Sequence, residues 1–418
     1  MNDSPRPQPQ PRTAGDGGPT PSRPSRRTVL TAVTMSAAAA TPLLAGTPAV
    51  AVPDRPSDLL YIGTWGQGQV YAVRFDPGRG TMTSLGSVAQ VSSNWVATHP
   101  TRPILYVAGG EQGGYIRVFR IDDASGALRQ LDEITVETVP TGSGGLSYIG
   151  LTSNADALLV ADFAAGSAVT VPLGPNGGLR AVASVVQDVG SGPSPRQTGP
   201  HPHCVVVDPS RRHALVADFG ADRVFVYDYD PATHRMSAGA PDGPGSYATA
   251  PGSGPRRLAF HPNGRTLYLL NELTADLQVL RWDAGQGELT PRQVLSTNAA
   301  DHTGTTSAAE LAVSRDGRYL YTSNRGENAL VVFSADPATG LLTETQRIPC
   351  AGVTPWSFAL HPGGRWLFVA NEASGRVSLF SVDRASGRLT DTGASVAVPY
   401  PDCIAFRTRQ EGHGAGPS

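Results

Sequence analysis

The sequence contains no lysine, so its 33 basic residues are all arginine, and 35 acidic residues balance them. The absence of lysine excludes a Schiff-base lysine and the lysine of a nucleotide-binding P-loop. A formal net charge of −2 excludes the strongly basic surface by which proteins attract nucleic acid. We therefore expect no nucleic-acid partner and no cofactor.

Cysteine is also scarce: Cys204, Cys350 and Cys403 are the three in the chain, and no two are spaced as a Cys-x-x-Cys pair. Three cysteines are too few for a disulfide-stapled scaffold or a thiolate metal centre. At most one disulfide can form, and the sequence leaves open whether Cys350 and Cys403 make it.

Long hydrophobic runs are absent as well, since no stretch supplies the ~20 apolar residues that span a bilayer. The most apolar segment, residues 29–45, follows the pair Arg26 and Arg27 and precedes the small residues Ala49–Ala51. Charged, apolar and small segments in this order are typical of a secretory signal, and paired arginines indicate the twin-arginine route. We predict a disordered tail and signal peptide over residues 1–51, export by the twin-arginine translocase and a secreted protein. The alternative is an uncleaved N-terminal anchor.

Internal repetition is the strongest pattern in the rest of the chain. Residues 258–271 (LAFHPNGRTLYLLN), 311–324 (LAVSRDGRYLYTSN) and 358–371 (FALHPGGRWLFVAN) are three copies of one motif. Weaker copies bring the number of units to seven, each of roughly fifty residues. The copies are aligned on Pro100, Ser153, Pro209, Pro262, Arg315, Pro362 and Thr408.

Each unit contains four short runs of strand type: an apolar run, a Tyr-Leu-Tyr type of run, a Val-x-Val-Phe run and a polar run. Third runs of this kind are Val70–Phe75, Ile116–Ile121, Val224–Tyr229 and Val377–Val382. Four-stranded units of this length are the blades of a β-propeller. We predict an all-β, seven-bladed propeller over residues 52–407 and a flexible tail over residues 408–418. A parallel β-helix is the competing architecture, but its repeat is far shorter; six or eight blades would require an error in the weakest copies.

The two ends of the repeat region complete one another. Residues 403–406 form a first run with no second run after it, whereas residues 59–63 form a second run with no first run before it. We therefore predict that these two segments pair and close the ring.

The repeat register predicts which side chains surround one mouth of the central channel. In the hairpin of the first two strands, the residue six before each alignment position faces the residue ten after it. The predicted ring comprises Asn94, Ser147, His203, Arg256, Ala309, Trp356 and Asp402, with Gly110, Phe163, Phe219, Glu272, Arg325, Glu372 and Trp65 opposite. Its ionisable members gather on neighbouring blades as His203, Arg256, Glu272 and Arg325. Such a cluster suits acid–base catalysis and anion binding; the alternative is an ion-pair ring that only holds the blades together.

Other candidates lie beside this cluster. His201 and Glu310 are candidate substrate-binding residues together with Trp356, and Glu372 repeats the position of Glu272 two blades later. A His201-x-His203 metal pair is conceivable, but no third ligand is spaced nearby, so we expect no metal. We expect structural roles for His99, His261 and His361 in the hairpins. Capping roles are expected for Asp162, Asp218, Asn271, Asn324 and Asn371, which recur nine residues after the alignment position. No serine lies in a nucleophile elbow.

Several of these segments resemble the bacterial 6-phosphogluconolactonase-type lactonase family, which also contains a fungal carboxy-muconate cyclising enzyme. The resemblance rests on residues 254–265 (GPRRLAFHPNGR) with 271–273 (NEL), on 200–203 (PHPH), on 309–326 (AELAVSRDGRYLYTSNRG) and on 370–372 (ANE). It covers residues 59–406 and implies a seven-bladed propeller. The family's functional histidine, arginine, glutamate and arginine correspond to His203, Arg256, Glu272 and Arg325. The export signal departs from the cytosolic setting of the familiar phosphorylated substrate.

The resemblance implies hydrolysis of a small-molecule, sugar-type lactone, and we expect a monomer. The sequence leaves open whether the lactone carries a phosphate or a carboxylate. Two arginines should keep Glu272 ionised, as a base requires, and we expect His203 to protonate the leaving alkoxide, although these two roles could be exchanged. Arg256 and Arg325 suit the substrate anion and the oxyanion. The alternatives are a muconate-type cycloisomerase, which export disfavours, and a non-catalytic binding propeller, which the intact quartet disfavours.

Overall fold

The computed structural model describes residues 57–110, 114–136, 145–239 and 245–408. The predicted N-terminal tail, the signal peptide and residues 409–418 lie outside the described residues. Within them all regular secondary structure longer than a turn is β-strand, and no helix is long and apolar enough to cross a membrane.

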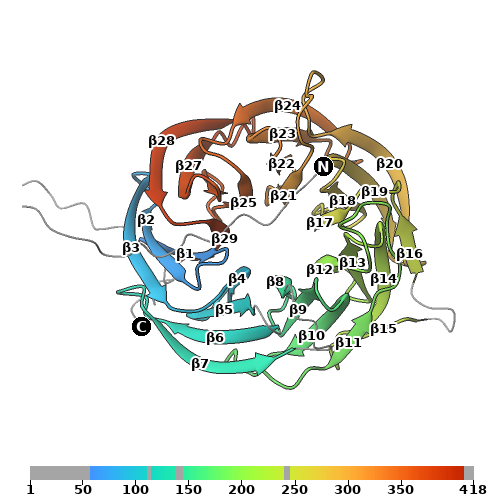
Figure 1. Cartoon of the computed structure of the whole chain (residues 1–418), viewed down its shortest axis with the longest axis horizontal. Coiled ribbons are helices and arrows are strands. Elements are labelled where there is room, and N and C mark those ends of the chain that lie inside the picture. Colours follow the sequence, from blue (N-terminus) through green and yellow to red (C-terminus); the bar gives the residue numbers. More distant parts are fainter. Residues whose placement is uncertain (1–56, 111–113, 137–144, 240–244, 409–418) are drawn as a thin grey trace, which may run out of the picture. The chain divides into compact units, whose positions relative to one another are not determined.

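Seven antiparallel sheets form a closed ring (Figure 1), as the repeat predicts. From the innermost strand outward, the sheets are β29 (Pro401–Arg407), β1 (Asp58–Thr64), β2 (Val70–Asp76) and β3 (Thr81–Ala89); β4 (Trp95–Thr98), β5 (Ile104–Gly109), β6 (Tyr115–Ile121) and β7 (Leu128–Thr135); β8 (Leu146–Leu151), β9 (Ala157–Asp162), β10 (Ser167–Pro172) and β11 (Ser184–Gln187); β12 (Pro202–Val207), β13 (His213–Asp218), β14 (Arg223–Asp230), β15 (Arg235–Ser237) and β16 (Gly245–Ala248); β17 (Pro255–Phe260), β18 (Thr266–Asn271), β19 (Asp276–Asp283) and β20 (Glu288–Ser296); β21 (Ala308–Val313), β22 (Tyr319–Asn324), β23 (Ala329–Ala335) and β24 (Leu342–Pro349); β25 (Pro355–Leu360), β26 (Trp366–Asn371), β27 (Arg376–Val382) and β28 (Leu389–Ala397).

Blade four differs from the expected four-strand pattern. Its outer edge is split between two short strands, because β15 and β16 both pair with β14, at different points along it. The other six blades have four strands each.

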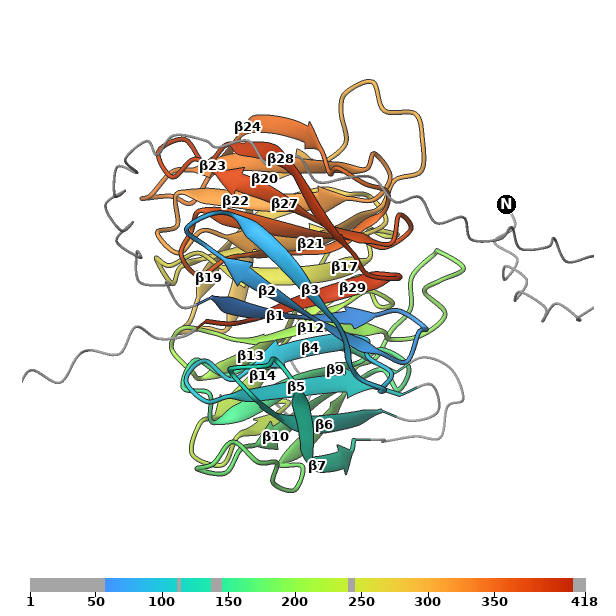
Figure 2. The ribbon, with the colours of Figure 1, turned by 90° about the vertical axis from the view of Figure 1, so that its left-hand side faces the viewer.

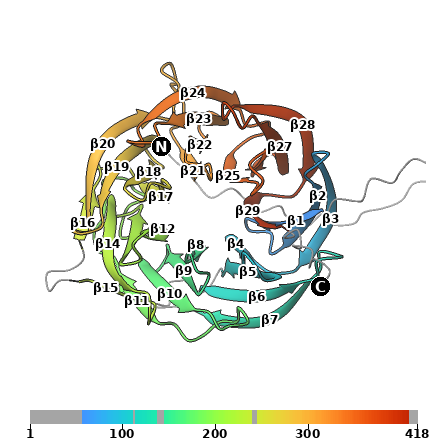
Figure 3. The same ribbon diagram turned by 180° about the vertical axis from the view of Figure 1, so that it is seen from behind.

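The ring closes as predicted. Strand β29 pairs with β1 from Leu59–Arg407 to Gly63–Cys403, so the last strand of the chain becomes the innermost strand of the first blade. The view from behind shows these two strands side by side at the ring's closure (Figure 3). This pairing gives the first blade four strands and joins the two ends of the repeat region in one sheet.

The hydrophobic core consists of seven clusters, each built by side chains from two neighbouring blades. In the side view of the ribbon, β1 of the first blade lies next to β4 of the second (Figure 2). A blade therefore buries both faces against its neighbours, which explains why the second strands are apolar at nearly every position.

The hairpin histidines connect adjacent blades, as expected for structural residues. His261 Nε2 lies 3.0 Å from the carbonyl oxygen of Gly317 on the next blade. His361 Nε2 lies 2.9 Å from the carboxylate of Asp58, and both side chains are buried at the ring closure.

The recurring Asp and Asn residues at the ends of the second strands cap loops. Asp218 Oδ1 accepts hydrogen bonds from the backbone amides of His201 and Ala221, both at 2.8 Å. Asn324 Nδ2 donates to the carbonyl of Thr297 at 3.0 Å. These caps fix the backbone immediately before the residues that surround the channel mouth.

Candidate functional site

A β-bulge directs the ring side chains into the channel mouth. The pairing of the innermost strand with the second strand shifts at one point in six blades, and the skipped residues are Ser147, His203, Arg256, Ala309 with Glu310, Trp356 and Asp402. Bulges re-aim side chains next to active sites because the extra residue leaves the regular alternation of the strand. The predicted ring positions are therefore the points where the regular register breaks.

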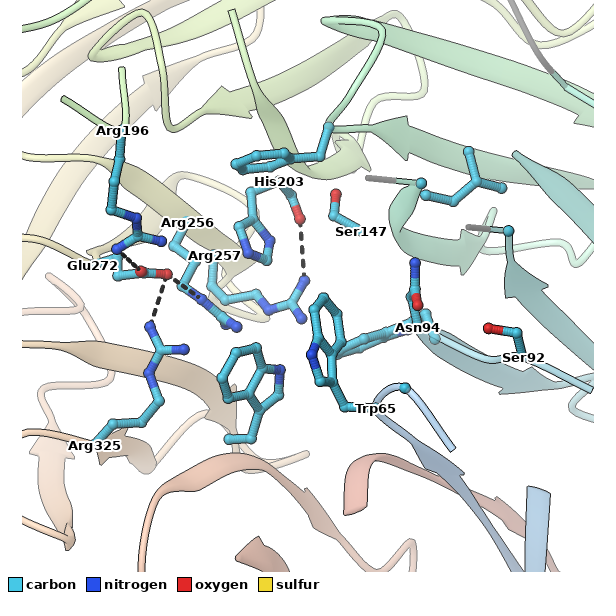
Figure 4. A pocket seen from close by; sticks show the side chains of 17 residues that line it. Trp65, Ser92, Asn94, Ser147, Arg196, His203, Arg256, Arg257, Glu272 and Arg325 are labelled. Atoms are coloured by element: carbon cyan, nitrogen blue, oxygen red, sulfur yellow. Dashed lines mark hydrogen bonds and ion pairs between the residues drawn. The ribbon is translucent and has the colours of Figure 1, made fainter. Parts of the chain in front are cut away.

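The side chains meet in a cavity of about 490 Å³ (Figure 4). This volume is typical of small-molecule sites. One side carries polar and charged residues and another carries aromatic rings. The lining residues are Trp65, Gly66, Ser92, Asn94, Trp95, Gly110, Gly145, Leu146, Ser147, Phe163, Arg196, His203, Arg256, Arg257, Glu272, Arg325 and Trp356.

Glu272 is the centre of the charged side. Its carboxylate lies 2.9 Å from Arg256 Nε, 2.9 Å from Arg325 Nη2 and 2.8 Å from Arg196 Nη1. Its backbone amide donates to the carbonyl of Gly254 at 2.7 Å, so its main chain is fixed beside the first strand of the same blade. Gly254 has φ +66°, and a Cβ there would meet Phe219 and Leu273 at 2.9 Å, so this turn requires glycine.

Burial and charge act in opposite directions on Glu272. Burial alone would raise its pKa, but Arg325, Arg256 and Arg196 hold it well below the ordinary value. Burial, together with Arg257 and Arg325, lowers the pKa of Arg256 to about 9, which still leaves the guanidinium charged at neutral pH. Three cations thus surround one permanently ionised carboxylate.

His203 lies beside this cluster with its ring edge facing Phe163, at a centroid separation of 5.9 Å. Burial, followed by the charges of Arg256 and Arg257, lowers its pKa well below the ordinary value of 6.5. The imidazole is therefore uncharged at neutral pH, which the sequence did not reveal because the burial of His203 and the position of Arg257 depend on the tertiary structure. Its Nδ1 is buried and has no hydrogen-bond partner among the described residues.

A second buried ion pair joins Arg257, which lines the cavity, to Glu310, which does not. Arg257 Nε is 3.1 Å from Glu310 Oε1, and Arg257 Nη1 donates to the carbonyl of His203 at 3.3 Å. The guanidinium carbon lies 4.1 Å from the ring centroid of Trp95 and 5.1 Å from that of Tyr148. This pair fixes the main chain of His203.

Two of the predicted substrate-binding residues are outside the cavity wall. Glu310 binds Arg257 and accepts a hydrogen bond from Ser357 at 3.3 Å, so it supports the wall from behind. His201 stacks on Phe163 at 4.4 Å, with Nδ1 2.8 Å from the carbonyl of Phe163. The expected substrate contact of Glu310 and His201 thus needs correction: neither lines the cavity, because Glu310 is held by Arg257 and His201 by Phe163.

Trp356 does line the cavity. Its ring lies 4.6 Å below the guanidinium carbon of Arg325 and 5.5 Å from the ring of Trp65. Ala309, Asp402, Phe219 and Glu372, which the register also places around the mouth, are not among the lining residues.

The described residues contain no group of three metal-ligating side chains, and a His201–His203 pair has no further ligand there. Cys204, Cys350 and Cys403 are buried free thiols. Cys350 and Cys403 belong to different hydrophobic clusters.

Sequence reasoning missed Arg196 and Arg257. Arg196 belongs to the connection between β11 and β12, and such connections differ in length from blade to blade, so the repeat register could not place it. Arg257 directly follows Arg256, and strict strand alternation would turn it away from the channel. The bulge at Arg256 interrupts this alternation, and it is visible only in the pairing of β17 with β18.

Comparison with known proteins agrees with this architecture. The model of the family described as "Lactonase, 7-bladed beta-propeller" matches residues 59–406. The 6-phosphogluconolactonase of Bacillus subtilis is 28% identical over 351 residues, which cover 83% of this chain and 97% of the relative.

Solved structures give the same result. The periplasmic gluconolactonase of Pseudomonas aeruginosa is 32% identical with a TM-score of 0.76, covering 84% of this chain and 99% of that one. A putative 6-phosphogluconolactonase of Bacteroides fragilis is 26% identical with a TM-score of 0.74, covering 85% and 99%. The chain therefore belongs to the seven-bladed β-propeller lactonase family and is a lactone hydrolase by class.

Proposed function

We propose that this protein is an exported, monomeric enzyme that hydrolyses a sugar-type lactone at the cavity around Glu272. The observation that carries the proposal is the set of three arginines fixed on one buried carboxylate, directly beside a neutral histidine. This arrangement supplies a proton acceptor and cations for a developing oxyanion in a single cavity.

His203 acts as the general base. A neutral imidazole accepts a proton from the attacking water, whereas Glu272 is a poor base because three arginines hold its pKa very low. Because Nδ1 is buried, we assign this proton transfer to Nε2. His203 thus takes the role of base that was expected of Glu272 and keeps its expected role as proton donor to the leaving alkoxide.

The reaction balances with these groups. Water loses a proton to His203 as its oxygen bonds to the lactone carbonyl carbon, and the carbonyl oxygen becomes an oxyanion beside Arg256 and Arg325. The bond between this carbon and the ring oxygen then breaks, and the imidazolium returns its proton to the leaving alkoxide. The product is the open hydroxy acid.

Glu272 holds the two arginines in place. Arg256 uses Nε for Glu272 and Nη1 for the carbonyl of Ala309, and Arg325 is fixed between Glu272 and Trp356. Prepositioned cations stabilise a transition state without reorganisation, which is the usual source of large catalytic effects.

A pH-indicator assay of the purified mature protein tests the activity. We expect glucono-1,5-lactone or its 6-phosphate to release acid faster than in the uncatalysed reaction, and EDTA to leave the rate unchanged. His203→Gln protein, folded by circular dichroism, is the matched blank for spontaneous hydrolysis. Equal rates with the wild type and this variant on every lactone tested would refute lactone hydrolysis at this site.

Export through the twin-arginine route is supported by Arg26 and Arg27, by the apolar and small residues after them, and by the periplasmic relative. Replacing both arginines by alanine should leave the precursor inside the cell, as measured by fractionation and immunoblotting. Normal export of the double variant would rule out the twin-arginine route.

A further inference from the structure

Arg196 differs from the other arginines on Glu272 in its exposure. Its side chain is 57% exposed, compared with 1% for Arg256 and 10% for Arg325. It approaches Glu272 from the connection between β11 and β12 and lines the cavity (Figure 4). It is therefore the cation of this cluster that solvent and an incoming ligand reach first.

The main chain beneath Arg196 is fixed. The next residue, Gln197, is fully buried and donates from Nε2 to the carbonyl of Phe219 and to Asp222 Oδ1, each at 2.7 Å. Asp222 also accepts hydrogen bonds from the amides of Gly252 and Gly254, so this anchor is tied to the turn that holds Glu272. The Arg196 guanidinium rests over Phe219 at 4.7 Å. An anchored loop thus presents a solvent-exposed side chain at a defined point of the mouth.

The ion pairs around Glu272 leave the Arg196 guanidinium able to bind an anionic ligand. Glu272 Oε2 contacts both Arg256 and Arg325, whereas among the described residues Arg196 is the cation on Oε1. When Arg196 turns to another anion, Glu272 keeps its two contacts to Arg256 and Arg325, so the buried carboxylate stays paired. Three positive charges facing one negative charge also leave the cluster with an excess of positive charge, which favours an anionic ligand.

We propose that Arg196 is a substrate-binding residue that selects lactones carrying an anionic group outside the lactone ring, a phosphate or a carboxylate. This inference rests on the proposed lactone hydrolysis. The anionic group exchanges with Glu272 for the Arg196 guanidinium, while Arg256 and Arg325 stay fixed on the carboxylate. The lactone ring then lies deeper, toward His203.

The test compares three substrates with wild-type and Arg196→Gln protein: glucono-1,5-lactone, its 6-phosphate and glucaro-1,4-lactone, which carries a free carboxylate. Loss of a charge-assisted hydrogen bond should raise KM for the preferred anionic lactone about 10- to 100-fold. We expect kcat to stay within about threefold, and KM for the neutral lactone likewise, because Arg196 contributes binding rather than transition-state stabilisation. The anionic lactone whose KM rises more in Arg196→Gln protein identifies the recognised group as a phosphate or a carboxylate.

Two variants act as controls. Arg196→Lys keeps the charge but loses the planar fork, so it should recover part of the affinity. Arg223→Gln removes an exposed arginine on β14 that donates a hydrogen bond to Ser246 outside the cavity. It should leave KM unchanged for all three substrates. Equal increases in KM for neutral and anionic lactones in Arg196→Gln would overturn the proposal, since Arg196 would then act only on Glu272.

Binding of 6-phosphogluconate and of glucarate, measured by calorimetry, separates this inference from the proposed function. If the wild type hydrolyses no lactone, the proposed function fails, yet weaker binding of either anion to Arg196→Gln would still support Arg196 as an anion receptor. The other outcome starts from a wild type that hydrolyses lactones. If Arg196→Gln protein then binds both anions with wild-type affinity and hydrolyses both anionic lactones at wild-type rates, only the inference on Arg196 fails.

Discussion

Glu272 on blade five and Glu372 on blade seven occupy the same position of the repeat. Each directly follows the last residue of a second strand, and each backbone amide donates to the residue that precedes the first strand, Gly254 at 2.7 Å and Thr354 at 2.9 Å. The two glutamates therefore have the same main-chain position and hydrogen bond. Any difference between them comes from neighbouring side chains.

Those neighbours differ. The bulge residue beside Glu272 is Arg256, and the one beside Glu372 is Trp356. Glu272 is 2% exposed and lines the cavity, whereas Glu372 is only partly buried and is not among the lining residues. Burial followed by the charge of Glu372 raises the pKa of Asp402 on the next blade, to about 7. The glutamate at this repeat position thus has a lowered pKa on blade five, whereas on blade seven its charge helps to raise the pKa of a neighbouring aspartate.

The largest effect should come from the base beside Glu272. His203→Gln should lower kcat about 10²- to 10⁴-fold, the range expected for loss of a general base. Since its pKa is lowered, the acid limb of the wild-type kcat/KM profile should lie below pH 6.5. His201→Gln, outside the cavity, is the control. An acid limb above pH 6.5, or an active His203→Gln protein, would contradict the assignment.

Glu272→Gln should have the next largest effect. Without the carboxylate, Arg256 and Arg325 repel one another and lose their common anchor, so kcat should fall about 10²- to 10³-fold. Steady-state kinetics of protein with a native circular dichroism spectrum measures this change. Full activity of Glu272→Gln protein would show that catalysis needs Glu272 no more than it needs Glu372.

Asp402→Asn tests the opposite side of the ring through stability. The raised pKa means that folded protein keeps the Asp402 proton from pH 3.8 to about 7, while the unfolded chain releases it. Stability of the wild type should therefore fall as pH rises through this window. Asparagine mimics the protonated group, so the variant should match the wild-type Tm near pH 4 and exceed it by roughly 2–5 °C at pH 8. Equal Tm values at pH 8 would contradict the shift.

Glu372→Gln should have the smallest effect. We expect kcat and KM within about twofold of wild type, because surface-side substitutions away from the reacting groups change little. Removing its charge should also lower the pKa of Asp402, which would weaken the pH dependence of Tm. A large loss of activity would place Glu372 in the catalytic machinery and end the contrast with Glu272.

Much of this site was predictable because a propeller repeats its geometry. Once Pro262 and its counterparts align, Arg256 must face Glu272, and the cavity indeed brings together His203, Arg256, Glu272, Arg325 and Trp356. The sequence could not place Arg196, which lies in a non-repeating connection. It also could not show that Glu310 faces Arg257 rather than the cavity, because that depends on a bulge.

From the sequence alone we could predict the seven-bladed ring, its closure by the two chain ends and the clustering of His203, Arg256, Glu272 and Arg325. These follow from local periodicity, since strand alternation and hairpin turns act over a few residues. Tertiary structure alone decided the protonation state of His203, the third cation on Glu272 and the contrast between Glu272 and Glu372. Each of these depends on burial and on charged side chains from different blades. Such residues lie far apart in the sequence, and no sequence pattern links them.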